Sequence, residues 1–321
     1  MLLLRIVIWM VPVGMMVIGA GRVCAQTYPD KPIRILTAEP GGGLDFQARL
    51  VAQGLSGSLG RQVIVENHGG GTFAAEIVAK APPDGYSLLF YGSNVWLAPF
   101  FRDDVPWDPV RDFAPVTLAV RSPNLVVVHP SLPVKSVRDL VALARARPGE
   151  LNYASGSTGS SPHLAAELFK FIAGVNIVRI PYRGNALAYT DVIRGQVQLI
   201  FPTASSVAPY LKAGRLRALA VTTARPSELF PGLPTVAASG LPGYESATIT
   251  GIFAPVRTPA AIIGRLNEEI VRVLKRPEVN DRFFSVGVET VGSSPEEFAA
   301  TVKSEMARLG KMIKDAGLRD E

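Results

Sequence analysis

The feature that most restricts the fold of this chain is a local pattern, strand then glycine loop then helix, that occurs twice near its start. An apolar run at 33–36 leads through Pro40-Gly41-Gly42-Gly43-Leu44-Asp45 into apolar residues at helical spacing. A second run at 62–66 leads through Asn67-His68-Gly69-Gly70-Gly71-Thr72 into another predicted helix. In a parallel sheet, two such loops approach each other at the carboxyl ends of the strands.

These two loops predict an anion-binding crevice. The free N–H groups in the first turn of a helix join the loop amides in facing one point, and the helix dipole favours negative charge there. For a single glycine-rich turn, a tight connection from strand to helix explains the glycines equally well. Two loops at one sheet edge favour a ligand site over that alternative.

The first 25 residues have the organisation of a secretory signal peptide. Arg5 precedes an apolar run from 6 to 20, and Val23-Cys24-Ala25 predicts cleavage between Ala25 and Gln26. The run is shorter than the ~20 residues that a membrane span needs. Arg22 stands where a lipoprotein signal requires a small or apolar residue, which argues against lipid attachment. We therefore expect a secreted, periplasmic protein.

The mature chain predicted in this way contains no cysteine, which excludes disulfides, thiol chemistry and thiolate metal sites. Of the 33 basic residues, Arg5 and Arg22 leave with the signal, so 31 remain against 27 acidic residues. The excess of about +4 charges mildly favours anionic ligands. Basic residues are scattered rather than clustered with aromatic ones, so we expect no nucleic-acid partner. With 321 residues, of which 48% are hydrophobic, two domains are expected.

A second candidate site follows a strand predicted at 151–154. The loop Ser155-Gly156-Ser157-Thr158-Gly159-Ser160 offers hydroxyls and amides as a neutral nest of donors, suited to a carboxylate or phosphate. Ser161 is the predicted N-cap of the next helix, Pro162 fits its first position, and Gly174 closes it.

Serines beside His163 also raise the alternative of catalysis. Within one helical turn, an N-cap explains such serines better than a nucleophile and its base. The chain has no G-x-S-x-G elbow and only 3 histidines, so a Ser-His-Asp triad has few ways to form. A secreted α/β hydrolase that uses the same cleft is therefore the alternative function.

Other strand ends carry polar residues that suit a binding loop. Ser93 and Asn94 follow the third strand of the first domain, and Tyr182 and Thr203 follow strands of the second. Turn formation explains Ser93 and Asn94 equally well, and packing explains Tyr182. The aspartates at 101–112 lack the spacing and the glycine of an EF-hand, so no metal is expected.

Apolar runs at 114–120 and 124–129, separated by Arg121-Ser122-Pro123, mark the start of the second domain. We expect residues 118–247 to form that domain, and residues 27–117 and 248–321 to form the first. Two helix starts are predicted by capping boxes. Their residues are Ser136 with Asp139, and Ser294 with Glu297.

Taken together, the motifs of this chain resemble those of the Bug-type receptors, the periplasmic solute-binding proteins of tripartite tricarboxylate transporters. The matching pieces cover essentially the whole mature chain. In order they are Y-P-D-K-P-I-R from Tyr28, P-G-G-G-L-D from Pro40, V-E-N from Val65, P-D-G-Y-S-L-L from Pro83, N-Y-A-S-G-S-T-G-S-S-P-H-L from Asn152, P-Y-R-G from Pro181, G-L-P-T-V from Gly232, G-L-P-G-Y-E from Gly240 and F-A-P-V-R-T-P from Phe253.

The resemblance implies a two-lobed α/β fold of the periplasmic-binding-protein type (Venus-flytrap, type II-like), each lobe a mixed sheet flanked by helices. It implies a small organic acid, a carboxylate or amino acid, as ligand, with a transporter permease or a sensor as partner. No catalysis and no cofactor are implied, and we expect a monomer. Carried over by motif and joined to the strand-end residues, the ligand-binding candidates are Pro40, Gly41, Gly42, Gly43, Asp45, Asn67, Gly70, Gly71, Thr72, Ser93, Asn94, Ala154, Ser155, Ser157, Thr158, Gly159, His163, Tyr182 and Thr203.

The sequence departs from the family pattern at the loops themselves. Family members usually place an aromatic and a small residue before P-G-G, where this chain has Ala38 and Glu39. Thr72 and Phe73 stand at the usual last glycines of the second loop. Glu39, if it faces the pocket, would repel a second acid group or attract an ammonium. These changes leave the identity of the ligand open.

Overall fold

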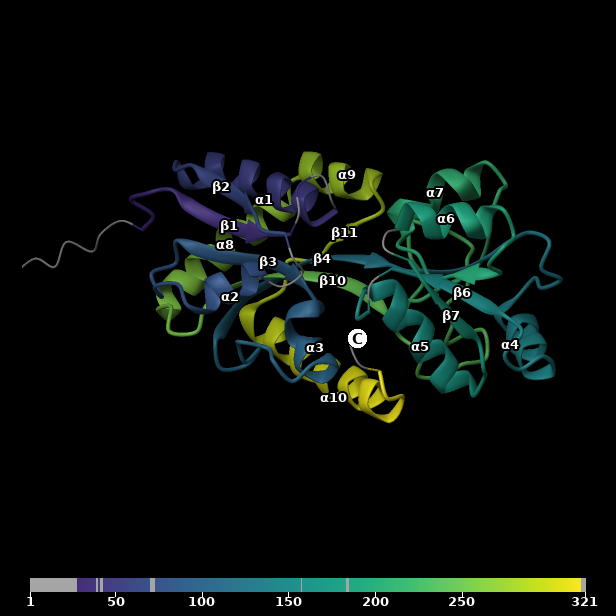
Figure 1. The fold of residues 1–321 in the computed structure, drawn as a ribbon. Helices are drawn as coiled ribbons and strands as arrows, with labels where there is room; N and C mark the ends of the chain where they lie inside the picture. The colour runs from purple at the N-terminus through teal and green to yellow at the C-terminus, as the bar shows by residue number, and fades with distance from the viewer. Residues whose placement is uncertain are drawn as a thin grey trace, which may run out of the picture.

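Two lobes lie side by side in the protein, each built on its own mixed sheet flanked by helices (Figure 1). The computed structural model describes residues 28–38, 40, 43–69, 73–156, 158–182 and 185–318, without the side chains of 185, 186 and 205. We call the lobe on the six-stranded sheet the first lobe and the lobe on the five-stranded sheet the second.

The sheet of the first lobe has the strand order β11-β4-β10-β3-β1-β2. Its strands β1, β2 and β3 run parallel, whereas β10 runs antiparallel to both β3 and β4. The strands are β1 (Ile33–Thr37), β2 (Val63–Asn67), β3 (Ser87–Gly92), β4 (Phe113–Pro123), β10 (Ala247–Pro255) and β11 (Glu289–Thr290). Register pairs Thr37 with Asn67, which brings the ends of β1 and β2 together at one edge.

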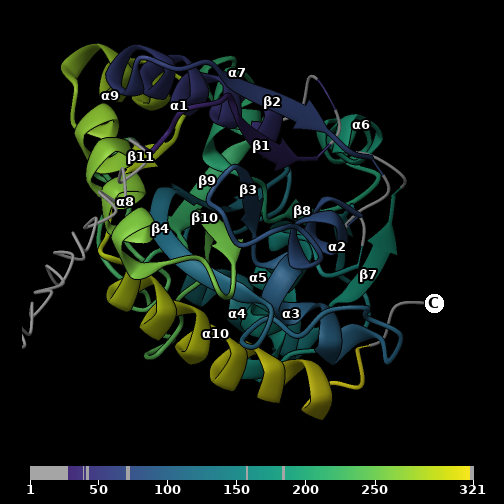
Figure 2. The same ribbon diagram turned by 90° about the vertical axis from the view of Figure 1, so that its left-hand side faces the viewer.

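Alternating side chains of these strands bury themselves in two layers of helices. In β3, Leu88 and Phe90 pack on one face, and Leu89 and Tyr91 pack on the other. The first face is covered by α1 (Gly43–Leu59), α8 (Ala260–Leu274) and α9 (Pro277–Ser285), and the second by α2 (Phe73–Ala79), α3 (Asn94–Phe101) and α10 (Pro295–Asp315). Figure 2 shows α1, α8 and α9 along one side of the lobe and α10 with α3 along the other.

The sheet of the second lobe has the order β7-β6-β8-β5-β9. Its strands are β5 (Leu125–Val128), β6 (Asn152–Ser155), β7 (Val178–Pro181), β8 (Leu199–Ile200) and β9 (Arg217–Val221). Its helices are α4 (Val137–Ala146), α5 (Ser161–Ala173), α6 (Asn185–Ile193) and α7 (Ala204–Lys212). Strand β6 lies between β7 and β8 and runs parallel to both, so the loop that follows it leaves from the middle of a parallel trio.

The lobes are joined where β4 and β10 run as a long antiparallel pair toward the second lobe (Figure 1). Asn124, fully buried, follows β4 and donates from Nδ2 to the Phe201 carbonyl at 2.9 Å. Its Oδ1 accepts from Ser161 Oγ at 2.9 Å and lies 3.1 Å from Thr248 Oγ1. Thr248 belongs to β10 and Ser161 begins α5, so one hydrogen-bond hub ties both crossing strands to that helix.

Some predictions of helix caps and ends were confirmed and others were wrong. The N-cap at Ser136 is confirmed, with its Oγ accepting from Asp139 N, and at Ser294 both bonds of the capping box are present. Gly174 closes α5 in the left-handed region, at φ 61°. The prediction of Ser161 as N-cap was wrong: the N-cap is Ser160, because the Ser161 hydroxyl bonds Asn124 instead. The two apolar runs around Arg121-Ser122-Pro123 lie in different sheets, since β4 of the first sheet continues to Pro123 and β5 of the second sheet begins at Leu125.

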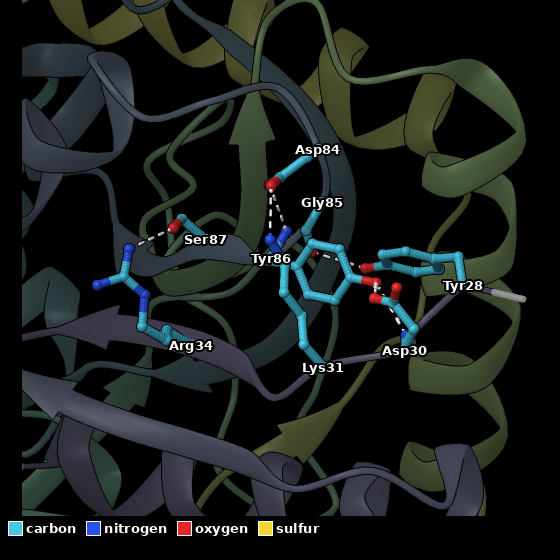
Figure 3. Close-up of polar contacts among 8 residues, drawn as sticks. All are labelled: Tyr28, Asp30, Lys31, Arg34, Asp84, Gly85, Tyr86 and Ser87. Carbon is cyan, nitrogen blue, oxygen red and sulfur yellow. Dashed lines mark hydrogen bonds and ion pairs between the residues drawn. The ribbon is translucent and has the colours of Figure 1, made fainter. Parts of the chain in front are cut away.

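The first residues that the structure describes are held at the amino ends of β1 and β3 (Figure 3). Tyr28 Oη donates to the Gly85 carbonyl at 2.6 Å, and Lys31 Nζ lies 3.2 Å from Asp84 Oδ2. Gly85 has φ 80°, and a Cβ there would lie 2.9 Å from Tyr28 Oη, so only glycine fits. The Y-P-D-K-P-I-R and P-D-G-Y-S-L-L motifs therefore contact each other. They do so at the end of the sheet opposite the glycine loops.

Candidate functional site

The ends of β1 and β2 are joined by side chains from the predicted site. Asp45, only 6% exposed, accepts from Arg49 Nε and from Asn67 Nδ2, both at 2.8 Å. Asn67 Nδ2 also donates to the Ala38 carbonyl at 2.8 Å, and Asn67 Oδ1 accepts from Arg49 at 2.9 Å. Because both amide hydrogens of Asn67 are used inside the protein, this side chain positions the loops rather than offering donors to a ligand.

Part of the predicted site lies outside the described residues, namely Gly41, Gly42, Gly70, Gly71, Thr72 and Ser157, together with Glu39. Pro40 and Gly43 are described, and Gly43 begins α1. The backbone bond from His68 N to the Thr37 carbonyl, 2.9 Å long, extends the pairing of β1 and β2 beyond their last residues. The two loops thus start from adjacent points of one sheet edge.

An arginine that our sequence reasoning missed donates hydrogen bonds to the loop after β6. Arg179 of β7 donates from Nε to Ser155 Oγ at 2.8 Å, from Nη1 to Thr158 Oγ1 at 3.1 Å and from Nη2 to the Gly156 carbonyl at 2.9 Å. The parallel pairing of β6 with β7 places Arg179 opposite Tyr153, two residues before Ser155. The sequence predicted that the loop after β6 offers only neutral donors. In the structure, a guanidinium is hydrogen-bonded to that loop. A charged residue inside an otherwise apolar strand, Val178-Arg179-Ile180, was the available signal.

His163 lies in the first turn of α5 and is fully buried. Its Nδ1 accepts from Gly159 N at 3.1 Å, which places the ring proton on Nε2. Burial, with the positive charges of Arg179 and Lys170, lowers the pKa of His163 from 6.5 to about 3, so the ring is neutral at physiological pH. Nε2 and the neighbouring Ser160 Oγ are buried and have no hydrogen-bond partner among the described residues. Buried polar atoms of this kind are rare without a ligand or water.

The remaining predicted residues differ in what their side chains do. Ala154 is buried in the core of the second lobe. Tyr182 Oη donates to Asp191 Oδ2 at 2.8 Å, and burial and this carboxylate raise the pKa of Tyr182 to about 12. Thr203 is the N-cap of α7, with Oγ1 2.9 Å from Ser206 Oγ. Tyr182 and Thr203 are thus engaged within their own lobe.

Ser93 and Asn94, predicted as loop residues, lie at the start of α3 instead. Ser93 is the N-cap and makes no side-chain capping bond, and Asn94 is an exposed first residue of the helix. The end of the same helix reaches the second lobe. A Cβ added to Gly159, which has φ 74°, would lie 3.1 Å from Phe101 Cε2. Gly159 is therefore required both by its backbone and by the approach of α3.

Four cavities lined by described residues lie away from these loops. One of them, of about 830 Å³, is formed between α7, β9 and the end of α9, and it is lined mainly by apolar residues such as Leu211, Leu233 and Phe284. In the described part of the chain, no helix combines the length and apolar character needed to cross a bilayer, and no group of three or more His, Cys, Asp or Glu side chains is placed to hold a metal.

Comparison with known proteins identifies the family. The sequence profile of the tripartite tricarboxylate transporter family receptor, TctC, matches residues 47–318. The chain belongs to this receptor family. Protein BugT of Bordetella pertussis is 33% identical over 305 residues, which cover 94% of this chain and 94% of BugT. The family receptors are solute-binding proteins, so the fold and the receptor role predicted from the motifs are confirmed.

Two solved structures show the same fold. The structure described as R. palustris Rpa4515 with adipate is 37% identical, with a TM-score of 0.78, and the match covers 90% of this chain and 98% of that one. MatC (Rpa3494) from Rhodopseudomonas palustris with bound malate is 27% identical, with a TM-score of 0.74, covering 89% of this chain and 100% of that one. Both were solved as complexes with small carboxylates.

Proposed function

We propose that this receptor captures a small organic acid between its lobes and delivers it to a membrane permease or a sensor. The observation that carries the proposal is the set of donors at the start of α5, which lies against α3 of the other lobe. It includes the loop hydroxyls and the Nε2–H of His163, which has no partner among the described residues. Adipate and malate in the related structures support a carboxylate as the bound group.

Among the predicted site residues, we assign two roles. Ser155, Thr158, Gly159 and His163 face the ligand, together with the glycine-loop residues outside the described part of the chain. Asp45, Asn67, Tyr182 and Thr203 position these loops, since their polar atoms are already bonded within the protein. Each hydrogen bond to a charged acceptor contributes on the order of 1.5–3 kcal/mol, so a few suffice for micromolar binding.

We further propose that the protein acts as a periplasmic monomer after removal of residues 1–25, and that it performs no catalysis. Ligand binding closes the lobes, because donors from both must contact one small molecule. The hinge is the β4–β10 crossing, and the moving block is the part of the predicted 118–247 segment that lies between these two strands.

Thermal unfolding with adipate, malate and a panel of amino acids tests the ligand class. A ligand at 100 times its Kd stabilises the native state by about 2.7 kcal/mol. Small-angle scattering should show a smaller radius of gyration at saturation. If no carboxylate raises the melting temperature while chromogenic esters are cleaved, the hydrolase alternative replaces the receptor proposal.

A further inference from the structure

The cavity of about 830 Å³ lies between the two lobes, and no described residue of the candidate binding loops lines it. The second lobe contributes α7, the start of β9 and residues 229–233, and the first lobe contributes residues 284–287 at the end of α9. Figure 1 shows α7 and α9 on one side of the two lobes, and α3, α5 and α10 on the other. The volume is within the range of small-molecule sites, roughly 300–1,000 Å³.

The walls of this cavity are apolar, and part of their surface is exposed. Ala204, Ala208 and Leu211 follow each other at helical spacing, so one face of α7 lines the cavity and its two alanines leave space there. The other large apolar side chains of the walls also keep some exposed surface, namely Leu229, Phe230, Leu233, Phe284 and Val286. Contiguous apolar surface that remains in contact with water typically marks a binding site.

Two cations line the cavity, and none of the described residues that line it is acidic. Lys212 ends α7 and Arg217 begins β9. Arg217 is half-buried and donates from Nη1 to the Val134 carbonyl at 3.0 Å. Neither cation forms an ion pair with a carboxylate of the described residues. Apolar walls with unpaired cations beside them are complementary to a molecule that has an apolar body and an anionic head.

We propose that this cavity is a second binding site, which takes an organic anion with an extended apolar chain, such as a medium-chain fatty acid. The chain lies along α7 and contacts Phe284 of the other lobe, and the carboxylate pairs with Arg217 and Lys212. This site is separate from the cleft of the proposed function and does not depend on which acid the cleft binds. Because its walls belong to both lobes, its affinity is linked to how far the lobes are closed.

Calorimetry with decanoate tests the site, and the wild type should bind one molecule per chain. Octanoate is shorter by two methylene groups and should bind roughly 15-fold more weakly, because each buried methylene contributes a similar increment of binding free energy. 1-Octanol keeps the chain of octanoate without the charge. It should bind at least ~10-fold more weakly than octanoate, as expected for the loss of hydrogen bonds between charged groups.

Variants locate the bound molecule. Ala208→Phe fills the cavity with an apolar ring and should abolish decanoate binding. Ala142→Phe is the matched control, because Ala142 is an exposed alanine of α4 in the same lobe and lies outside the cavity, so the affinity should not change. Arg217→Gln should weaken decanoate by roughly 10-fold and 1-octanol by much less.

Thermal unfolding of each variant shows whether it is folded. Phe284 is 41% exposed, so Phe284→Ser removes the first-lobe wall of the cavity without opening a core. This variant should weaken decanoate at least ~5-fold, and it decides the question if Ala208→Phe is not folded.

Three results overturn the proposal. A wild type that does not bind decanoate has no such site. Equal decanoate affinities in the wild type and in folded Ala208→Phe and Phe284→Ser variants would place the molecule elsewhere, for example in the cleft. If 1-octanol binds as tightly as octanoate, the two cations do not recognise a charge, and the cavity is not an anion site.

Discussion

Glu305 of α10 should make the stability of the protein depend on pH in an unusual direction. Its Oε2 accepts from Trp96 Nε1 at 3.0 Å, and Trp96 is fully buried beneath the β4–β10 pair. Arg121, Glu245 and Arg308 line the cavity of about 360 Å³ beside it. Burial is the main cause that raises the pKa of Glu305 from 4.5 to about 7, opposed by the Trp96 N–H and by Arg308.

The sign follows from proton counting. Between pH 4.5 and about 7 the native state holds a proton on Glu305 that the unfolded state has lost. Stability contributed by this group is therefore fully present below pH 4.5 and is lost as pH rises toward 7. At about 1.4 kcal/mol per pH unit, the loss is on the order of 3 kcal/mol. Glu305→Gln keeps an acceptor for Trp96 and removes the titration.

Urea unfolding of the wild type and Glu305→Gln from pH 4 to 8 measures the effect. The two free energies of unfolding should be similar at pH 4, and the variant should be the more stable protein at pH 8, by up to about 3 kcal/mol. Glu268→Gln, an exposed residue of α8, is the control and should track the wild type at every pH. If the Glu305→Gln curve runs parallel to that of the wild type, the carboxylate is not held neutral and the reasoning fails.

Three further variants test other parts of the framework. Gly251→Ala should lower the free energy of unfolding by about 1–3 kcal/mol in urea titrations, because its Cβ would overlap the fully buried ring of Phe298; an unchanged value would mean that the ring can move. Ser294→Ala removes the capping box of α10 and should cost about 1 kcal/mol by the same measurement, and no loss would contradict the role of the cap. Thr248→Val removes the hydroxyl that lies 2.7 Å from Ser161 Oγ, so it should change the lobe closure seen by scattering on adding ligand, whereas identical closure would leave the hub without a part in the hinge.

What the sequence allowed us to predict follows local rules. Capping at Ser136 and Ser294 was correct because such motifs are satisfied within four residues of chain. The order of strands and helices in both lobes was predicted from hydrophobic periodicity, which is also a local property of the chain. Ser93 and Asn94 were read as loop residues and helix α3, which begins at Asn94, was not predicted, although its residues Val95, Trp96, Leu97 and Ala98 are all buried. A helix that is apolar all round carries no period to detect.

The chemistry of the site was less accessible, since it depends on partners far apart in the chain. Ser161 was taken for a cap, but its partners Asn124 and Thr248 lie 37 and 87 residues away. Asn67 was predicted to bind the ligand, and a separation of 22 residues hides the hydrogen bond from its side chain to Asp45. Arg179 was overlooked because its targets lie on the neighbouring strand's loop. Polar residues at strand ends predict a site at one end of each sheet, and tertiary contacts are needed to propose which of them bind and which position the loops.

The two lobes differ in the balance of their charges near the cleft, and this difference suggests how binding favours closure. In the described part of the first lobe, the Asp45–Arg49 pair is internally neutral and both amide hydrogens of Asn67 are used, so neither the pair nor the Asn67 side chain adds a net charge or a free donor for an anion. In the second lobe, Arg179 and the start of α5 leave a positive potential that no described acid cancels. On the proposed function, an organic acid held between the lobes brings its negative charge toward that potential. The attraction across the cleft then favours the closed form, and a ligand without a negative charge lacks this contribution to closure.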